Sequence, residues 1–408
     1  MKNIKFFIEN NTIDDIFKIS VKKFKKEIFL SHPKIRNNKK KNDYTYEEVF
    51  NYTQTFKKYF DKLHIKQGER VAVIVGNIPE FFIIKLSLNC IGVSCVPINY
   101  ELTLNEINYI IKHSNSRYII TSIDFLENIK KIVSKKNLAL GILLFKNNNI
   151  IEIKKNKEKK RKTYKKILPS SEASLLYTSG TTGKPKACIL SHFYEINAGF
   201  SYLLKKELVS IRIKNERLYN CLPVHHVNSG IFSFYAVLIS GNCQIQAKRF
   251  STANFWKEIK YSNATIFHYL GIMAPVLLKK KKTQLEIDNK LRLGVGAGIE
   301  PALHKKFEKR FKIPMVELWG MTEMVRCIFD NKKNRIIGKR CFGKPDKSLE
   351  IKLYNAKTVN FLFKQGELLI RHNSKNPKKG FFTGYYKNNY ETKKIWKNNW
   401  FHTGDIVK

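Results

Sequence analysis

The stretch Tyr177-Thr-Ser-Gly-Thr-Thr-Gly-Lys-Pro-Lys186 is the most informative part of this chain. It combines hydroxyl side chains, glycines and lysines, so backbone N–H groups, hydroxyls and ammonium groups are available to a single ligand. That set of donors suits a polyphosphate. The stretch is not the common P-loop, because only two residues separate Gly180 from Gly183 and Pro185 follows Lys184.

The residues on either side of this stretch predict its structural setting. Ser174-Leu-Leu-Tyr177 and Ala187-Cys-Ile-Leu190 are short apolar runs typical of buried strands. Ser191-His192 is placed to cap a helix that begins near Phe193. We therefore expect a loop that connects two strands. A flexible Ser/Thr/Gly linker is the alternative, but Pro185 and the abrupt apolar flanks argue against it.

The rest of the chain predicts a layered α/β protein. Gly68–Val75 reads as a turn and a buried strand, Pro79 opens a helix that extends through Leu88, and Val93–Pro97 reads as the next strand. Strands that alternate with helices across short turns indicate a parallel α/β sheet. We expect an α/β body over 1–340, with subdomains of about 1–170 and 171–340.

The last part of the chain has a different pattern. Beyond Gly338, short strands such as Leu349–Ile351 and Gly366–Arg371 are separated by turns. This pattern predicts a small β-rich subdomain over 341–408, packed on the α/β body.

Composition narrows the class of protein. The chain has 408 residues, of which 43% are hydrophobic, so we expect a globular fold with a large core. No apolar run is long enough for a membrane-spanning helix, and the N-terminus does not resemble a signal peptide. The 7 cysteines form no CxxC pair, which favours reduced thiols in a cytoplasmic protein. Composition leaves the oligomeric state open.

The formal net charge of +43 allows a nucleic-acid-binding role. However, the lysines are spread along the whole chain, whereas nucleic-acid footprints are usually localised. Lys, Asn, Ile, Phe and Tyr are all abundant and all have AT-rich codons. Codon bias is therefore the simpler explanation, and we expect no specific nucleic-acid partner.

Further motifs carry chemistry. Leu293-Gly-Val-Gly-Ala-Gly298 precedes a helix that Pro301 is placed to open. It is a tight strand–helix turn or a weak dinucleotide fingerprint without its last glycine. Glu317-Leu-Trp-Gly-Met-Thr-Glu323 places an aromatic ring, a hydroxyl and a carboxylate together, and a carboxylate near polyphosphate usually indicates Mg²⁺. His225 and His226 suggest a metal site, but no further ligand lies at suitable spacing, so a buried structural histidine is the default.

Together these motifs resemble those of the adenylate-forming family, which includes acyl-CoA synthetases, luciferases and peptide-synthetase adenylation domains. The ten-residue stretch resembles the family's phosphate-binding signature, and Glu317–Glu323 resembles its aromatic-Gly-x-Thr-Glu motif. Leu222–Val227 resembles a proline-histidine segment near the acyl pocket. Gly384–Tyr386, Thr392 and Trp400–Asp405 resemble the segment that ends in a ribose-binding aspartate. The resemblance implies the fold of the family's large N-terminal domain, with layered α/β subdomains and a small β-rich subdomain.

The resemblance also implies roles for individual residues. It places a histidine matching His226 beside the acyl site, and it lets adenine lie against the small residues of the 296–298 turn. It implies stacking by Trp319, a phosphate contact from Thr322, Mg²⁺ binding by Glu323 and ribose binding by Asp405. The expected catalytic residues are Lys186, Thr322, Glu323 and His226. The expected nucleotide-binding residues are Thr178, Ser179, Gly180, Thr181, Thr182, Gly183, Lys186, Gly296, Ala297, Gly298, Glu317, Trp319, Gly320, Thr322 and Asp405.

The reaction implied by the resemblance has two steps. A carboxylate attacks the α-phosphorus of ATP to give an acyl-adenylate and pyrophosphate, and a thiol, that of CoA, then displaces AMP. The segment around Pro223 and the Phe255-Trp256 pair resemble ligases for carnitine-type or short and medium acyl acids. The identity of the acid stays open.

One departure from the family affects the expected activity. Family members continue for roughly a hundred residues past the aspartate that matches Asp405, into a small mobile domain, whereas this sequence stops at Lys408. We therefore expect weak adenylation and impaired thioester formation. The alternatives are an adenylation domain that loads a carrier-protein thiol, and a non-catalytic ATP-binding remnant.

Overall fold

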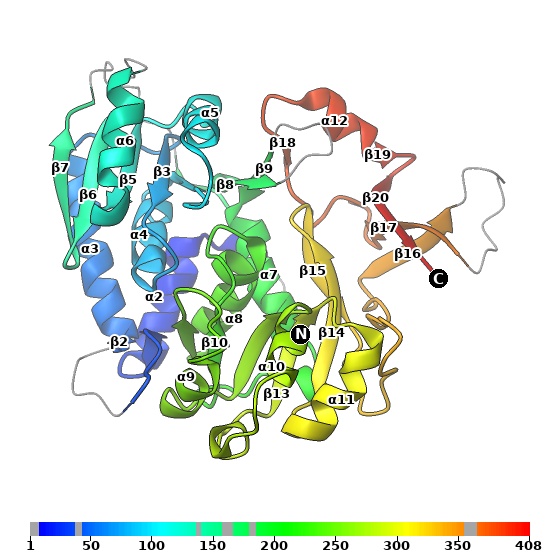
Figure 1. Cartoon of the computed structure of the whole chain (residues 1–408). Helices are drawn as coiled ribbons and strands as arrows, with labels where there is room; N and C mark the ends of the chain where they lie inside the picture. Colours follow the sequence, from blue (N-terminus) through cyan, green and yellow to red (C-terminus); the bar gives the residue numbers. More distant parts are fainter. Residues whose placement is uncertain (1–7, 37–42, 136–139, 157–165, 179–184, 355–364) are drawn as a thin grey trace.

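The computed structural model describes residues 8–36, 43–135, 140–156, 166–178, 185–354 and 365–408 (Figure 1). Within these ranges the chain forms two large mixed sheets and one small antiparallel sheet. Helices cover the faces of the large sheets. The predicted layered α/β body with a small β-rich subdomain is confirmed.

The first large sheet has a parallel centre and antiparallel edges. Its strands, in spatial order, are β18 (Gly384–Tyr385), β9 (Lys186–Ser191), β8 (Glu172–Thr178), β4 (Ser94–Pro97), β3 (Arg70–Ile74), β5 (Tyr118–Ser122), β6 (Gly141–Lys146) and β7 (Asn149–Lys154). The strands from β8 to β6 run parallel, and β9, β18 and β7 pair antiparallel with their neighbours.

The second large sheet is built in the same way. Its strands, in spatial order, are β15 (Met324–Phe329), β14 (Met315–Met321), β13 (Leu293–Ala297), β12 (Ile266–Leu270), β10 (Arg217–Asn220), β11 (Cys243–Gln246), β1 (Ile28–Ser31) and β2 (Asp43–Thr45). Strands β14 to β1 run parallel, so their carboxyl ends lie along one edge of the sheet. In open α/β sheets, this edge is where ligands bind.

The helices are amphipathic where they cover a sheet and apolar all round where they are enclosed. They are α2 (Ile13–Phe24), α3 (Tyr46–Lys62), α4 (Glu80–Asn89), α5 (Leu104–Ser114), α6 (Ile123–Lys135), α7 (His192–Leu203), α8 (Phe234–Ser240), α9 (Phe255–Tyr261), α10 (Met273–Leu278), α11 (Pro301–Phe311) and α12 (Asn389–Lys394). Short turns of helix lie at η1 (Glu207–Val209), η2 (Asn228–Ser233) and η3 (Gln284–Glu286). Ser191 caps α7 as predicted, because its hydroxyl accepts the N–H of Tyr194. Every residue of α4 is buried, as expected for an enclosed helix.

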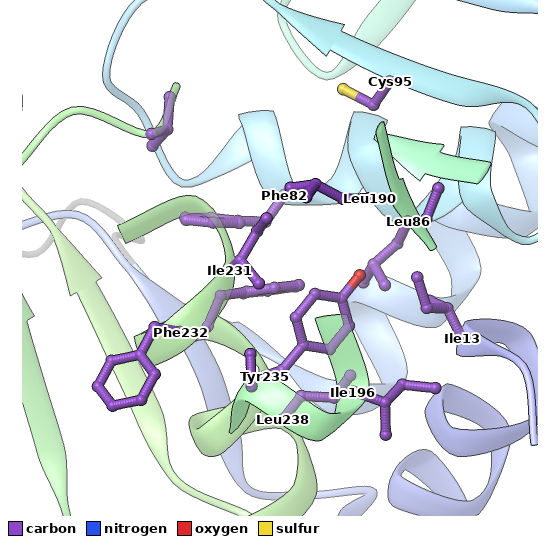
Figure 2. Close-up of a cluster of buried hydrophobic side chains, with 14 of the residues drawn as sticks. Ile13, Phe82, Leu86, Cys95, Leu190, Ile196, Ile231, Phe232, Tyr235 and Leu238 are labelled. Carbon is purple, nitrogen blue, oxygen red and sulfur yellow. The ribbon is translucent and has the colours of Figure 1, made fainter. Parts of the chain in front are cut away.

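The core lies in layers that follow the alternation of each strand. On β3, Val71 and Val73 face a large apolar cluster between the two large sheets. Figure 2 shows part of this cluster, to which α2, α4, α7, η2 and α8 contribute side chains. On the same strand, Ala72 and Ile74 face a second cluster under α5 and α6. A third cluster lies between the second sheet and α9, α10 and α11. The succession is therefore helix, sheet, helix, sheet, helix.

The small sheet consists of β16 (Leu349–Tyr354), β17 (Gly366–His372), β20 (Trp400–Val407) and β19 (Trp396–Lys397), all antiparallel. Strand β18 leaves this region and pairs with β9 of the first large sheet. Figure 1 shows how this excursion connects the red C-terminal part to the body.

The large sheets do not divide the chain at residue 170. Strands β8 and β9, which follow that residue, belong to the first sheet, whereas β1 and β2 near the N-terminus belong to the second. The reason is physical: β8 continues the parallel ladder beside β4, and β1 pairs with β11. Such long-range pairings leave no mark in local sequence.

Candidate functional site

The predicted phosphate loop lies between two strands of an antiparallel hairpin. Thr178 at the end of β8 pairs with Lys186 at the start of β9, and the Thr178 hydroxyl donates to the Lys186 carbonyl at 3.4 Å. The expected connection of two strands is confirmed. Of the predicted loop residues, Ser179, Gly180, Thr181, Thr182 and Gly183 lie outside the described residues.

The Lys186 ammonium is held by a carboxylate that the sequence had not pointed to. Its Nζ lies 2.5 Å from Glu391 Oε2 and 5.2 Å from the ring centre of Tyr385. The hydrogen bond from Lys186 lowers the pKa of Glu391. Glu391 lies directly before Thr392, whose hydroxyl accepts the Tyr385 N–H at 2.9 Å. The spacing of the Tyr-Tyr and Thr motif was therefore the available signal, because it places this helical turn of α12 beside β18.

Tyr385 joins the lysine to the predicted metal ligand. Its hydroxyl donates to Glu323 Oε1 at 2.6 Å, and the N–H of Phe382 donates to the Glu323 carbonyl at 2.9 Å. Burial and the neighbouring negative charge of Glu323 raise the pKa of Tyr385 above its usual value. Beside them, Tyr194 donates to the Thr322 carbonyl at 2.6 Å. The structure thus brings Lys186 and Glu323 to the two sides of one tyrosine.

Glu317 holds the 296–298 turn, against which adenine is predicted to lie. This buried carboxylate accepts the N–H of Gly298 at 3.1 Å and that of Ile299 at 2.9 Å, and its Oε1 also accepts the Tyr269 hydroxyl at 3.1 Å. Both of its oxygens are therefore engaged by protein donors. The geometry gives Glu317 a supporting role behind the turn, while direct contact with a nucleotide stays a prediction.

The two glycines of the 296–298 turn are required for different reasons, close packing at one and backbone conformation at the other. A Cβ at Gly296 would lie 2.1 Å from the Tyr269 carbonyl oxygen, so strand packing alone requires glycine there. Gly298 has a φ of 79° and no heavy atom within 4 Å of an added Cβ. Its backbone conformation favours glycine, and its open side leaves room for a flat group. Ala297 ends β13 between them.

Trp319 and Asp405 come from different sheets and meet. The indole Nε1 donates to Asp405 Oδ2 at 2.8 Å. Next to Trp319, a Cβ on Gly320 would lie 2.8 Å from Cys327 Sγ, so a larger residue would force β14 and β15 apart. The residues predicted to bind adenine and ribose are therefore neighbours in space.

The two adjacent histidines differ in their surroundings. His225 is buried, and burial together with the neighbouring His226 lowers its pKa to about 3. His226 reaches solvent, yet the protein around it desolvates the ring and lowers its pKa. Asn77 holds the segment before them, because it accepts the Val224 N–H at 2.8 Å and donates to Ala247 O at 2.7 Å. This segment follows β10 and thus lies at the same sheet edge as the 296–298 turn.

Two further observations define the setting. Among the described residues, no group of three or more His, Cys, Asp or Glu side chains is arranged to hold a metal ion. A groove of about 750 Å³ is lined by residues such as Phe193, Lys378, Phe381 and Phe382. None of the predicted nucleotide-binding residues that the structure describes lines this groove, and those residues gather at the strand ends instead.

None of the described helices is long and apolar enough to cross a bilayer.

A family model described as AMP-binding enzyme matches residues 17–386. A very long-chain fatty acid transport protein of Cochliobolus heterostrophus is 28% identical over 67% of this chain and 42% of its own length. A crotonobetaine/carnitine–CoA ligase of Proteus mirabilis is 25% identical over 89% of this chain and 71% of its own length.

The fold has close structural counterparts. A putative long-chain-fatty-acid CoA ligase of Rhodopseudomonas palustris superposes with a TM-score of 0.80 at 17% identity, covering 97% of this chain and 96% of that one. The chain spans about half the length of the fatty acid transport proteins that it matches, between 42% and 49% for three of them. Its fold is that of the solved CoA ligase, and because the family model matches most of its residues, the chain belongs to the AMP-binding enzyme family.

Proposed function

We propose that this protein is an AMP-forming carboxylic acid–CoA ligase. The single observation that carries the proposal is the position of Tyr385, which contacts both Lys186 at the start of β9 and the carboxylate of Glu323. A cation and a carboxylate at fixed positions beside a predicted phosphate loop suit the binding of a nucleotide triphosphate with its metal ion. The ring of Trp319 and the Asp405 carboxylate supply the other end of such a site.

In the proposed first step, a carboxylate oxygen of the acid attacks the α-phosphorus of ATP, the bond to the β-phosphate breaks, and pyrophosphate leaves. This displacement needs no protein nucleophile. It needs positioning of the two reactants and neutralisation of charge at phosphorus. Lys186 supplies a cation, and Thr178 and the loop residues 179–183 supply hydrogen-bond donors. Thr322, whose carbonyl accepts a hydrogen bond from Tyr194, precedes Glu323 in the chain.

Mg²⁺ suits the donor set on one point that this structure shows. Glu323 is buried and one of its oxygens is held by Tyr385, which fixes the carboxylate for a cation. Mg²⁺ usually takes one or two protein carboxylates and completes its shell with phosphate oxygens and water. Glu323 would hold the ion, which would neutralise charge on the phosphates.

The acceptor and the acid are the finer parts of the proposal. We propose that CoA takes the acyl group from the adenylate. We also propose that the acid is a small carboxylic acid that binds beside His226, at the carboxyl ends of the strands. The relatives named as fatty acid transport proteins and as a crotonobetaine/carnitine–CoA ligase support an acyl substrate. A cytoplasmic location also stays a prediction.

The proposal is tested by acid-dependent exchange of labelled pyrophosphate into ATP, over a panel of short, medium, long and carnitine-type acids. We expect at least one acid to support exchange, and Lys186→Ala to reduce it by about 10²-fold through the loss of a charge at the reacting phosphate. Lys397→Ala, an exposed lysine on β19, is the matched control. Thioester formation is measured separately by adding CoA or a carrier-protein thiol.

Each outcome is informative. Exchange without thioester formation would support adenylation alone. ATP binding without exchange for any acid would contradict the proposed activity and favour a non-catalytic nucleotide-binding protein.

A further inference from the structure

We propose that the indole N–H of Trp319 positions the Asp405 carboxylate and thereby sets how strongly the site recognises the ribose of the nucleotide. The inference rests on the proposed function, in which Asp405 accepts hydrogen bonds from ribose hydroxyls. The Trp319 side chain then has two separate roles, because its ring faces the base while its N–H orients the carboxylate.

The contact itself is short and joins two sheets. Trp319 lies on β14 of the second large sheet and Asp405 on β20 of the small sheet, and the indole Nε1 lies 2.8 Å from Asp405 Oδ2. Within the described parts of the chain, no lysine, arginine or histidine forms an ion pair with Asp405. The indole is therefore the side chain that restricts the rotamer of an otherwise exposed carboxylate.

Asp405 is presented by an irregularity in β20. The pairing of β17 with β20 shifts between Leu369↔His402 and Glu367↔Ile406, so residues 403–405 stand out of the ladder. The Asp405 N–H donates to Thr403 Oγ1 at 3.0 Å, and Gly404 has a φ of 76°. Bulges of this kind redirect a side chain beside functional sites. Here the bulge brings the carboxylate toward β14.

Trp319 is held independently of Asp405. The register of β14 against β15 shifts between Trp319 and Met321, and Gly320 lets Cys327 approach the backbone at this point. The ring of Phe342 lies 6.2 Å from the indole, measured between ring centres. Because the indole is fixed by its own strand and by Phe342, the hydrogen bond orients the carboxylate rather than the ring.

The chemical consequence concerns the two carboxylate oxygens. An N–H donor to an ionised carboxylate makes a stronger and more directional hydrogen bond than a neutral pair does. With Oδ2 engaged, Oδ1 is left to accept from the sugar. Phenylalanine at 319 would keep an aromatic face for the base but remove the donor, so it separates the two jobs.

The test is direct binding by calorimetry of ATP and 2′,3′-dideoxy-ATP to the full chain and to its variants. We expect Trp319→Phe to weaken ATP binding by about five- to tenfold, the scale of one hydrogen bond to a charged group. The same variant should change the affinity for the dideoxy nucleotide by less than about twofold, since that nucleotide has no hydroxyl for Asp405. Trp319→His, which keeps a ring N–H, should recover part of the discrimination. Trp396→Phe on β19 is the matched control, and thermal melting checks that all variants are folded.

The outcomes separate this inference from the proposed function. Equal losses for both nucleotides in Trp319→Phe would show that the indole acts by stacking alone and would overturn the inference. A Trp319→Phe variant that distinguishes the two nucleotides as well as the wild type does would overturn the inference too. If the wild-type protein itself does not distinguish the two nucleotides, the ribose role of Asp405 fails and the inference fails with it. If the wild type discriminates, Trp319→Phe loses that discrimination and acid-dependent exchange is absent, the inference stands while the proposed activity fails.

Discussion

At the residue scale, single hydroxyl and N–H groups organise the candidate site. Tyr385 is the clearest case, because its ring contacts Lys186 and its hydroxyl holds Glu323. Neither residue is in the same strand as the tyrosine, so the arrangement depends on one side chain from β18 reaching both.

Removing the Tyr385 hydroxyl should weaken the metal dependence of the site. In Tyr385→Phe, Glu323 loses its 2.6 Å donor, so its carboxylate is held less firmly. We expect the Mg²⁺ concentration for half-maximal pyrophosphate exchange to rise several-fold, and the free energy of unfolding to fall by about 1–2 kcal/mol because a buried carboxylate loses a partner. Tyr390→Phe, at an exposed position 74% accessible to solvent, is the control. An unchanged Mg²⁺ requirement would contradict a positioning role for Tyr385.

At the element scale, a buried ion pair links two helices of the central layer. Lys85 on α4 lies 2.9 Å from Glu195 on α7, and the two side chains are 2% and 0% exposed. The Lys85 ammonium also donates to Ser174 of β8 at 2.5 Å. The pair therefore sets the position of α7, the helix that follows the phosphate hairpin, against the sheet beneath it.

Breaking this pair should cost far more than replacing it. Lys85→Met leaves the Glu195 carboxylate buried without its cation, and we expect a loss of about 3–5 kcal/mol in the free energy of unfolding. The double variant Lys85→Met/Glu195→Leu should recover most of that loss, because two apolar groups replace two charges. Urea unfolding measures both. A double variant as unstable as the single one would show that the ion pair itself, rather than the uncompensated charge, carries the stability.

At the scale of the whole molecule, buried neutral histidines make stability depend on pH. Burial lowers the pKa of His192 to about 4, and of His225 and His268 to about 3. In the unfolded chain a histidine titrates near about 6.5, so between that pH and the folded value the unfolded state binds protons that the native state does not. The contribution of these histidines to the free energy of unfolding is therefore fully present above about pH 6.5, and it is lost as the pH falls toward 4.

We expect the free energy of unfolding to decrease on acidification from pH 7.5 to 5, with a slope of up to about 1.4 kcal/mol per pH unit for each of these histidines. His268 is fully buried, and its Nδ1 lies 2.7 Å from Asn228 Oδ1. His268→Gln should therefore reduce the slope, whatever its effect at neutral pH. Urea titrations at several pH values provide the measurement. An equal slope in the variant would contradict the assignment of this histidine.

Much of the fold follows from local patterns. Short apolar runs mark β3, β4, β8 and β9, and Ser191 marks the start of α7, because strand burial and helix capping depend on neighbours along the chain. The small sheet was likewise foreseeable from its short strands and turns. The membership of β1 and β8 in their sheets was not, because pairing across long stretches of chain has no local signal.

For the candidate site, the sequence determined the chemical inventory: a donor-rich loop, Lys186, the 296–298 turn, Trp319, Glu323 and Asp405 all stand in recognisable motifs. Only the tertiary structure decided which of these groups are engaged and by whom. Glu391 takes the Lys186 ammonium, Glu317 turns its oxygens to the backbone at Gly298, and Trp319 donates to Asp405. The physical reason is that hydrogen bonds and ion pairs depend on distances of a few ångströms between strands. Those distances are set by register shifts and sheet pairing rather than by the identity of any one residue.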